Sequence, residues 1–221
     1  MTRRTTCREK SNEMKSKPPV LESYGRLAAD YDRRWSGYLR RTIQETLTRM
    51  PLHGGESVLE VGCGTGALLA VLAERHPPPL LSGIDPVPQM LARARDRLRE
   101  EVTLKEGWAE QLPFDDEQFD IVVSLSMFHY IRDPDAALAE MFRVLRPGGR
   151  LVISDWCHDY LSCRLCDWYL KWSDPAHFKT YRSAECENLL REAGFQSVAS
   201  ERYKINWLWG MMTATGKKPS W

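Results

Sequence analysis

The chain has 221 residues, of which 43% are apolar and 28% charged, and its formal net charge is +1 at pH 7. This composition is that of an ordinary globular protein of one domain, and it excludes collagen-like, coiled-coil, fully disordered and disulfide-stapled chains. The longest uncharged stretches, 61–73, 121–131 and 205–216, are shorter than the ~20 residues that a membrane span needs, so we expect no membrane span.

The charge is unevenly distributed along the chain. Residues 1–19 hold six Lys or Arg and two Glu, which gives +4 there and leaves −3 for the remaining 202 residues. No apolar stretch follows this basic start, so we expect no secretory signal. We expect residues 1–20 to form a disordered basic tail, with a weak contact to an anionic surface as the alternative. The mildly acidic remainder argues against nucleic acid as a partner.

Residues 21–221 are predicted to form a single domain in which helices and strands alternate. Helices are expected at 22–35, 37–50, 68–73, 87–98, 137–145, 160–172 and 183–193. Strands are expected at 57–61, 80–85, 102–106, 119–124, 151–154, 196–203 and 207–216. This alternation predicts an α/β, Rossmann-like doubly wound fold, with a mostly parallel seven-stranded sheet and an antiparallel last hairpin strand. Ligands of such sheets bind beyond the carboxyl ends of the strands.

A glycine-rich turn follows the first predicted strand and precedes a helix, with glycines at Gly62, Gly64 and Gly66. Glycine allows positive φ angles and a close approach of a ligand, and the helix N-terminus adds N–H groups and partial positive charge. The pattern predicts a nucleotide-cofactor loop. It also satisfies the dinucleotide pattern G-x-G-x-x-G/A through Ala67, and a tight turn without a ligand is the remaining alternative.

Asp85 strengthens the prediction of a nucleotide site. It ends the second predicted strand, where a carboxylate can accept hydrogen bonds from both hydroxyls of a ribose. A helix N-cap before Pro86 is the alternative interpretation, and the two roles are compatible.

The ordered set of motifs resembles the class I S-adenosylmethionine-dependent methyltransferases, in particular the group that includes the ubiquinone and menaquinone C-methyltransferases. The resemblance covers residues 24–155. It rests on segments 27–32, 60–66, 85–91, 107–114, 119–124 with His129 after it, and 145–149.

The resemblance implies S-adenosyl-L-methionine as the cofactor. The glycine loop would hold its methionine tail, Asp85 its ribose and Ala109 its adenine edge, while Tyr31 would close over it. Trp108 stands where the family often has Asp, so we expect a ring stacked on the adenine instead of an accepted hydrogen bond, with a ring that only caps the pocket as the alternative. The residues implied to bind the cofactor are Tyr31, Glu60, Gly62, Cys63, Gly64, Gly66, Asp85, Pro86, Met90, Trp108, Ala109, Glu110 and Ser124.

Catalytic and acceptor-binding residues are expected near the same edge of the sheet. His129 and Asp155 are the catalytic candidates, because an imidazole can act as a general base and a carboxylate can orient it. The alternative for His129 is that it only shapes the cofactor pocket. The candidates for the acceptor site are Tyr24, Trp35, Tyr130, Trp156 and His158.

The six cysteines are expected to be reduced thiols of a cytoplasmic protein. They are Cys7, Cys63, Cys157, Cys163, Cys166 and Cys186. Because their spacing does not fit a standard zinc site, we predict packed thiols and no metal, with a zinc or metalloid site as the alternative. Within the domain, residues 21–155 would bind the cofactor, 156–182 would form an acceptor-site insertion or lid, and 183–221 the C-terminal helix and strands.

The sequence therefore predicts methyl transfer from S-adenosylmethionine to a small-molecule acceptor, by in-line displacement in a desolvated pocket without metal. The methylated atom is left open among C, O, N and a sulfur or metalloid nucleophile. A nicotinamide-dinucleotide oxidoreductase and a non-catalytic S-adenosylmethionine-binding protein are the alternatives. We expect a monomer or homodimer.

Overall fold

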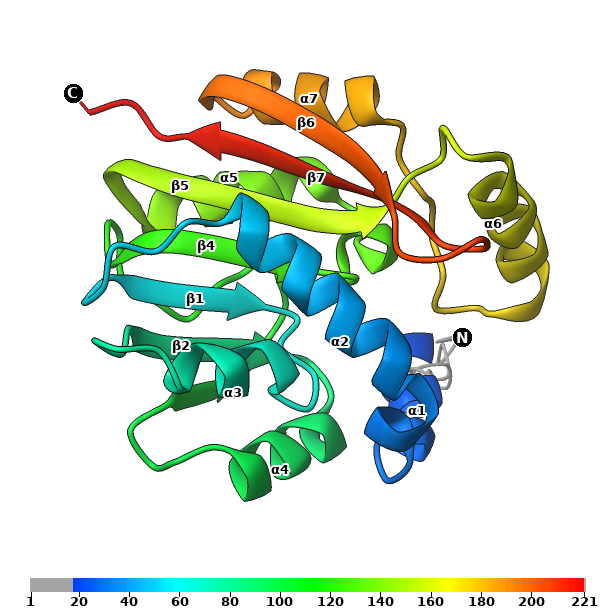
Figure 1. The fold of residues 1–221 in the computed structure, drawn as a ribbon, viewed down its shortest axis with the longest axis horizontal. Helices are drawn as coiled ribbons and strands as arrows, with labels where there is room; N and C mark the ends of the chain where they lie inside the picture. Colours follow the sequence, from blue (N-terminus) through cyan, green and yellow to red (C-terminus); the bar gives the residue numbers. More distant parts are fainter. Residues whose placement is uncertain (1–17, 221) are drawn as a thin grey trace, which may run out of the picture.

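The computed structural model describes residues 18–220, so the predicted tail over residues 1–17 lies outside the described residues. Its centre is a seven-stranded sheet in the order β3-β2-β1-β4-β5-β7-β6 (Figure 1). The strands β1 to β5 pair in parallel, and β7 runs antiparallel to both β5 and β6, which confirms the predicted fold class. The strands are β1 Ser57–Val61, β2 Leu80–Asp85, β3 Thr103–Glu106, β4 Phe119–Leu125, β5 Leu145–Trp156, β6 Gln196–Lys204 and β7 Gly210–Lys217.

The helices cover both faces of the sheet (Figure 1). They are α1 Pro19–Leu27, α2 Tyr31–Arg49, α3 Ala67–Ala73, α4 Pro88–Arg97, α5 Pro134–Val144, α6 Leu161–Ser173 and α7 Ser183–Glu192, with a 3₁₀ turn η1 at Phe128–Tyr130. Among the described residues, no helix is long and apolar enough to cross a bilayer.

Two boundaries differ most from the sequence prediction. The break between the first two helices lies at 28–30 instead of 36, because Pro19 starts α1 early and Asp30 stands before α2, while Gly37 is tolerated inside that helix. Strand β5 begins six residues before Leu151, because residues 146–149 form an irregularity in the pairing of β4 with β5 and do not end the strand.

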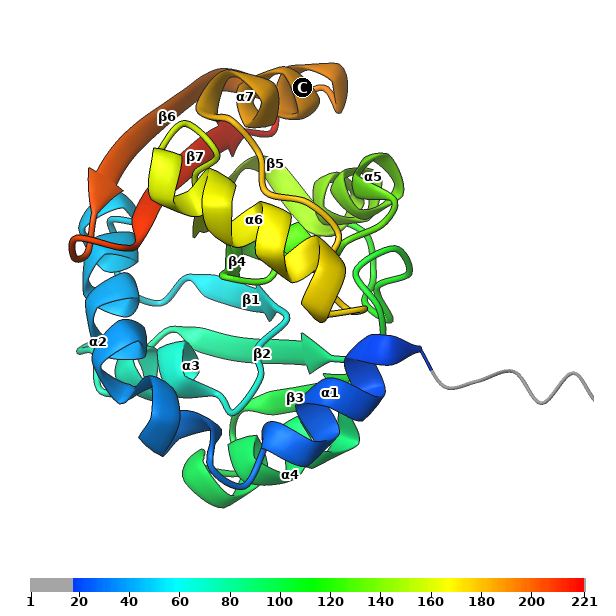
Figure 2. The ribbon, with the colours of Figure 1, turned by 90° about the vertical axis from the view of Figure 1, so that its right-hand side faces the viewer.

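Two apolar clusters sandwich the sheet. Leu59 of β1 packs on the side of α5 and α7, whereas Val58 packs on the side of α2 and α3. Because β1, β2 and β4 are parallel, their carboxyl ends meet at one edge. Helices α1 and α6 lie beyond this edge, and Figure 2 views the molecule from that side.

Leu59 tests how much the central strand contributes to stability. It is fully buried, so Leu59→Ala should lower the free energy of unfolding by about 2–5 kcal/mol. The matched control is Leu80→Ala at the other end of the sheet, where Leu80 is 71% exposed and the expected change is below about 0.5 kcal/mol. Urea unfolding measures both, and equal effects would contradict the assignment of the core.

Candidate functional site

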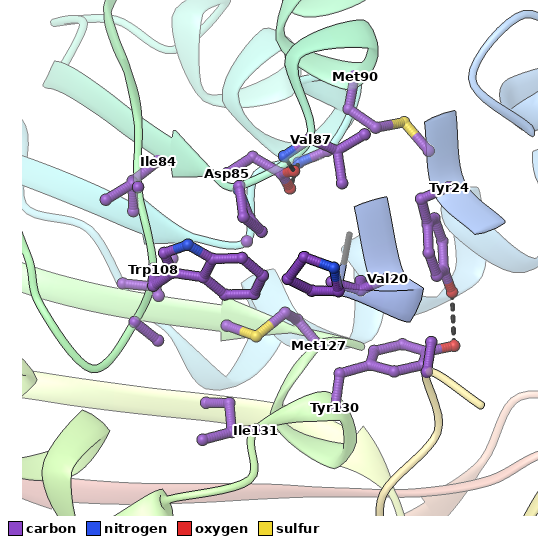
Figure 3. Close-up of a pocket in the computed structure, with 18 of the residues that line it drawn as sticks. Val20, Tyr24, Ile84, Asp85, Val87, Met90, Trp108, Met127, Tyr130 and Ile131 are labelled. Atoms are coloured by element: carbon purple, nitrogen blue, oxygen red, sulfur yellow. Dashed lines mark hydrogen bonds between the residues drawn. The ribbon is translucent and has the colours of Figure 1, made fainter. Parts of the chain in front are cut away.

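A cavity of about 520 Å³ lies beyond the carboxyl ends of β1, β2 and β4 (Figure 3). One side is formed by α1 and the segment before it, and the opposite side by the turn after β4 and by Ala176, which follows α6. Its position is the one expected for a ligand site of a doubly wound sheet.

The glycine loop after β1 forms one wall of the cavity. The N–H groups of Gly62 and Cys63 both donate to the carbonyl of Ile84, at 2.8 and 3.0 Å. Gly62 has φ +77°, and a Cβ atom there would lie 2.3 Å from Cγ of Met127 across the cavity wall. Since these amides are already bonded within the protein, the loop offers a ligand its backbone surface and the space beside it, not free N–H groups.

Asp85 joins this loop to the start of α4. Its Oδ2 accepts from the N–H of Gly64 at 2.8 Å, and its Oδ1 accepts from the N–H of Val87 at 2.9 Å. Burial raises the pKa of Asp85 to about 6, although the two N–H bonds act to lower it. A carboxylate has about four lone-pair sites, so two remain for hydroxyl groups of a ligand in the cavity.

Glu60 is buried behind the same loop. Within residues 18–220 its Oε2 has no hydrogen-bond partner, and burial, followed by the nearby charge of Asp85, raises the pKa of Glu60 well above its usual range. A buried polar oxygen without a partner is costly, and Glu60 lies behind the loop, outside the residues that line the cavity.

The start of α2 is fixed over the loop by a small polar network. Thr65 of the loop donates to Asp32 at 2.6 Å. Arg97 of α4 donates to the carbonyl of Thr65 at 2.8 Å and pairs with Asp32. This network holds Tyr31 in the cavity wall.

Aromatic side chains narrow the cavity. The hydroxyls of Tyr24 on α1 and Tyr130 in η1 form a hydrogen bond across it, which Figure 3 shows as a dashed line. The ring of Trp108 extends into the cavity between Asp85 and Met127 (Figure 3). The cavity is therefore lined by aromatic rings and mostly apolar side chains, and Asp85 and Glu110 are the acidic residues among them.

Most of the predicted cofactor residues line the cavity. These are Tyr31, Gly62, Gly64, Asp85, Pro86, Met90, Trp108, Ala109 and Glu110, and two acceptor candidates, Tyr24 and Tyr130, join them. Glu60, Cys63, Gly66, Ser124, Trp35, Trp156 and His158 are not among the lining residues. The Cys63 side chain packs beneath Gly83, and Gly66 lies against Ala94 and Leu98.

His129 and Asp155 lie next to the cavity and bind one another. Nδ1 of His129 is 2.7 Å from Oδ1 of Asp155, and the N–H of His129 donates to Oδ2 at 2.9 Å. The imidazole stacks on Trp156 at 4.4 Å between ring centroids. Both residues are buried, so the pair fixes η1 to β5 and thereby places Tyr130 in the wall.

The cysteines of the C-terminal part are packed as separate thiols. Cys163 donates to the carbonyl of Gly210 at 3.1 Å, and burial raises the pKa of Cys157 to about 12. In the described part of the chain, no three His, Cys, Asp or Glu side chains gather as a group that could hold a metal ion. Of residues 156–182, the cavity is lined by Ala176 alone.

Several lining residues carry no sequence signal. Val20, Met127, Arg132 and Ala176 come from segments that only the tertiary fold brings together. Asp32 could have been found, because it follows Tyr31, which was predicted to close over the cofactor. Its partner Thr65, however, lies 33 residues away in the chain.

Residues 59–153 match a family described as a methyltransferase domain. A malonyl-[acyl-carrier protein] O-methyltransferase of Serratia marcescens is 36% identical over 145 residues, which are 65% of this chain and 55% of that protein. A demethylmenaquinone methyltransferase of Deinococcus radiodurans is 39% identical over 123 residues, which are 54% of this chain and 49% of that protein. The chain thus spans about half the length of these curated relatives.

Among solved structures, a S-adenosylmethionine-dependent methyltransferase of Thermotoga maritima has a TM-score of 0.75 and 22% sequence identity to this chain. The match covers 90% of this chain and 99% of the other. At this identity the likeness shows the fold alone.

The raised pKa of Asp85 predicts a pH-dependent stability. The unfolded chain loses this proton near pH 3.8 and the folded protein near pH 6, so the folded state binds the extra proton between these values. The free energy of unfolding of the wild type, relative to Asp85→Asn, should therefore fall by up to about 3 kcal/mol as the pH rises from about 4 to above 6. Urea unfolding of both proteins across this range measures it, and a difference that rises with pH would contradict the assigned burial.

Proposed function

Because residues 59–153 form a class I S-adenosylmethionine-dependent methyltransferase domain, we propose that this chain transfers a methyl group from S-adenosylmethionine to a small-molecule acceptor. The observation that carries the proposal is the buried carboxylate of Asp85, which lines the cavity beside the glycine loop with lone pairs left for a ribose.

The cavity residues fit the parts of this cofactor. Asp85 would hold the ribose hydroxyls, and Trp108 with Ala109 would contact the adenine. The backbone of Gly62 and Gly64 leaves room for the methionine tail, and Glu60 supports this loop from behind, outside the cavity lining. S-adenosylmethionine supplies a methyl group on a cationic sulfur. The carboxylates of Asp85 and Glu110 favour that positive charge.

The chain's part in the reaction is to position the two reactants and exclude water. The nucleophile forms its bond to the methyl carbon as the carbon–sulfur bond breaks on the opposite side, so the walls must hold three atoms in line. Tyr24, Tyr31 and Tyr130 keep the cavity narrow and apolar, which strengthens the electrostatic interactions within it. This displacement requires no metal ion.

A base is needed only when the acceptor carries a proton. His129 and Asp155 are buried outside the cavity lining, and the catalytic roles predicted for them stay predictions. A cavity of about 520 Å³ lies within the range of small-molecule sites, which favours a small acceptor over a nucleic acid. We place the activity in the cytoplasm, since the five cysteines in the described part of the chain are free thiols.

Ligand-induced stabilisation tests the choice of cofactor. S-adenosylhomocysteine, the product form, should stabilise the folded protein by roughly 2.7 kcal/mol when present at a hundred times its Kd. NAD at the same concentration should have no effect. A thermal-shift assay compares the two, and stabilisation by NAD alone would favour the oxidoreductase alternative.

A pair of glycine variants tests the wall of the cavity. Gly62→Ala places a Cβ against Met127, which would have to move into the space for the ligand. Its affinity for S-adenosylhomocysteine should fall at least about tenfold in a calorimetric titration. Gly55→Ala is the matched control, because Gly55 has a similar φ of +75° but nothing within 4 Å of the added Cβ. A similar loss in both variants would mean that backbone strain, not the cavity, is responsible.

A further inference from the structure

Helix α6 exposes its apolar side chains and buries its acid. Asp167 and Cys163 face the protein, whereas the opposite face carries residues at positions i, i+4, i+7, i+8 and i+11. These residues are Leu161 at 67% exposure, Leu165 at 61%, Trp168 at 76%, Tyr169 at 57% and Trp172 at 85%. An apolar face of this kind marks an interaction surface more often than a scatter of single residues does.

The contacts of Asp167 fix this orientation. The carboxylate lies 2.8 Å from Nζ of Lys171 and 2.9 Å from Nε2 of His177, and it accepts from the N–H of Thr180 at 2.9 Å. Burial opposes ionisation, but these bonds hold the pKa of Asp167 down to about 2. Turning the helix to bury its tryptophans would carry Asp167 away from His177 and Thr180 and leave their buried donors without an acceptor, so the apolar face stays outward.

A further exposed aromatic residue lies in the loop next to α6. Trp207, 83% exposed, lies in the uncharged loop between β6 and β7. The loop lies beside α6, because Leu170 and Trp209 pack on the same cluster and Cys163 donates to the carbonyl of Gly210. We call the five exposed α6 residues together with Trp207 the α6 face. Figure 2 shows α6 lying across the side of the molecule beyond the carboxyl ends of the strands.

The exposed charged residues of α6 itself are positive. Arg164 and Lys171 are exposed on the helix, and its one acid, Asp167, is buried. Residues 1–17 add +4, and the described chain begins at Pro18, which lines the same cavity as Ala176, three residues after α6. Thus the described chain begins on the same side of the molecule as the α6 face, and the basic residues 1–17 precede that point in the sequence.

We propose that the α6 face docks on an anionic lipid bilayer. Tryptophan and tyrosine favour the headgroup region, where an apolar ring can be buried and its polar edge stays hydrated. Arg164, Lys171 and the basic start of the chain would meet the anionic headgroups. In a symmetric pairing with a second copy, the same cations would face one another with no exposed acid of α6 to balance them.

Vesicle binding tests this inference with the full chain. Vesicles of equal parts phosphatidylcholine and phosphatidylglycerol should retain the protein in a flotation assay, and added salt should weaken the binding. Vesicles of phosphatidylcholine alone should retain far less. The double variant Trp168→Ser/Trp172→Ser should bind the anionic vesicles at least about tenfold more weakly.

A matched pair of leucines controls for a general loss of surface hydrophobicity. Leu165→Ser should weaken vesicle binding, whereas Leu80→Ser, at the other end of the sheet, should not, although both side chains are exposed. All variants should bind S-adenosylhomocysteine like the wild type, because none of these residues lines the cavity, so the result does not depend on the proposed function. Equal retention by both vesicle types, or retention by the double variant, would overturn the inference. The inference would also be overturned if sedimentation showed a dimer of the wild type that the double variant no longer forms.

Discussion

The carboxylate of Asp85 is the interaction on which the site depends. It is buried at the end of β2, where burial disfavours its charge, and it accepts one N–H from the glycine loop and one from the start of α4. These two hydrogen bonds connect the end of β2 with the glycine loop and with the start of α4. They also hold the carboxylate facing the cavity without using all of its lone pairs.

The rest of the cavity is arranged around this point. The loop amides of Gly62 and Cys63 are bonded to Ile84, so the loop has one fixed shape before a ligand arrives. Asp32, Thr65 and Arg97 fasten α2 to that loop, and the pair of His129 and Asp155 fastens η1 to β5. Such prior bonding reduces the ordering that binding would otherwise require.

The parts that could be predicted from the sequence are those with a local cause. The bounds of β1 and β2 are as predicted, because each is a short, mostly apolar run followed by a turn or helix-starting residues. Asp85, Gly62 and Gly64 could be placed at the cavity for the same reason, whereas Gly66 packs against α4. Met127 and Ala176 could not, because only the packing of distant segments brings them to the wall. The longer β5 was missed because residues 146–149 continue a strand through an irregular pairing.

Helix α6 shows a different limit of sequence reasoning. It belongs to residues 156–182, which were predicted to form an acceptor-site insertion or lid, yet only Ala176 of this segment lines the cavity. The structure turns Trp168 and Trp172 outward because Asp167 has partners on the inside, His177 and the N–H of Thr180. The polar contacts of one residue with a neighbouring segment thus decide which face of the helix is buried. The spacing of apolar residues alone does not show which face that is.

The central claim is that Asp85 and the glycine loop form the binding site for S-adenosylmethionine. An experimental structure of the protein with S-adenosylhomocysteine tests it most directly. The account predicts the ribose hydroxyls on the carboxylate of Asp85, the adenine against Trp108 and Ala109, and the amino-acid tail along Gly62 and Gly64. A ligand bound elsewhere, or an adenosine without contact to Asp85, would contradict it.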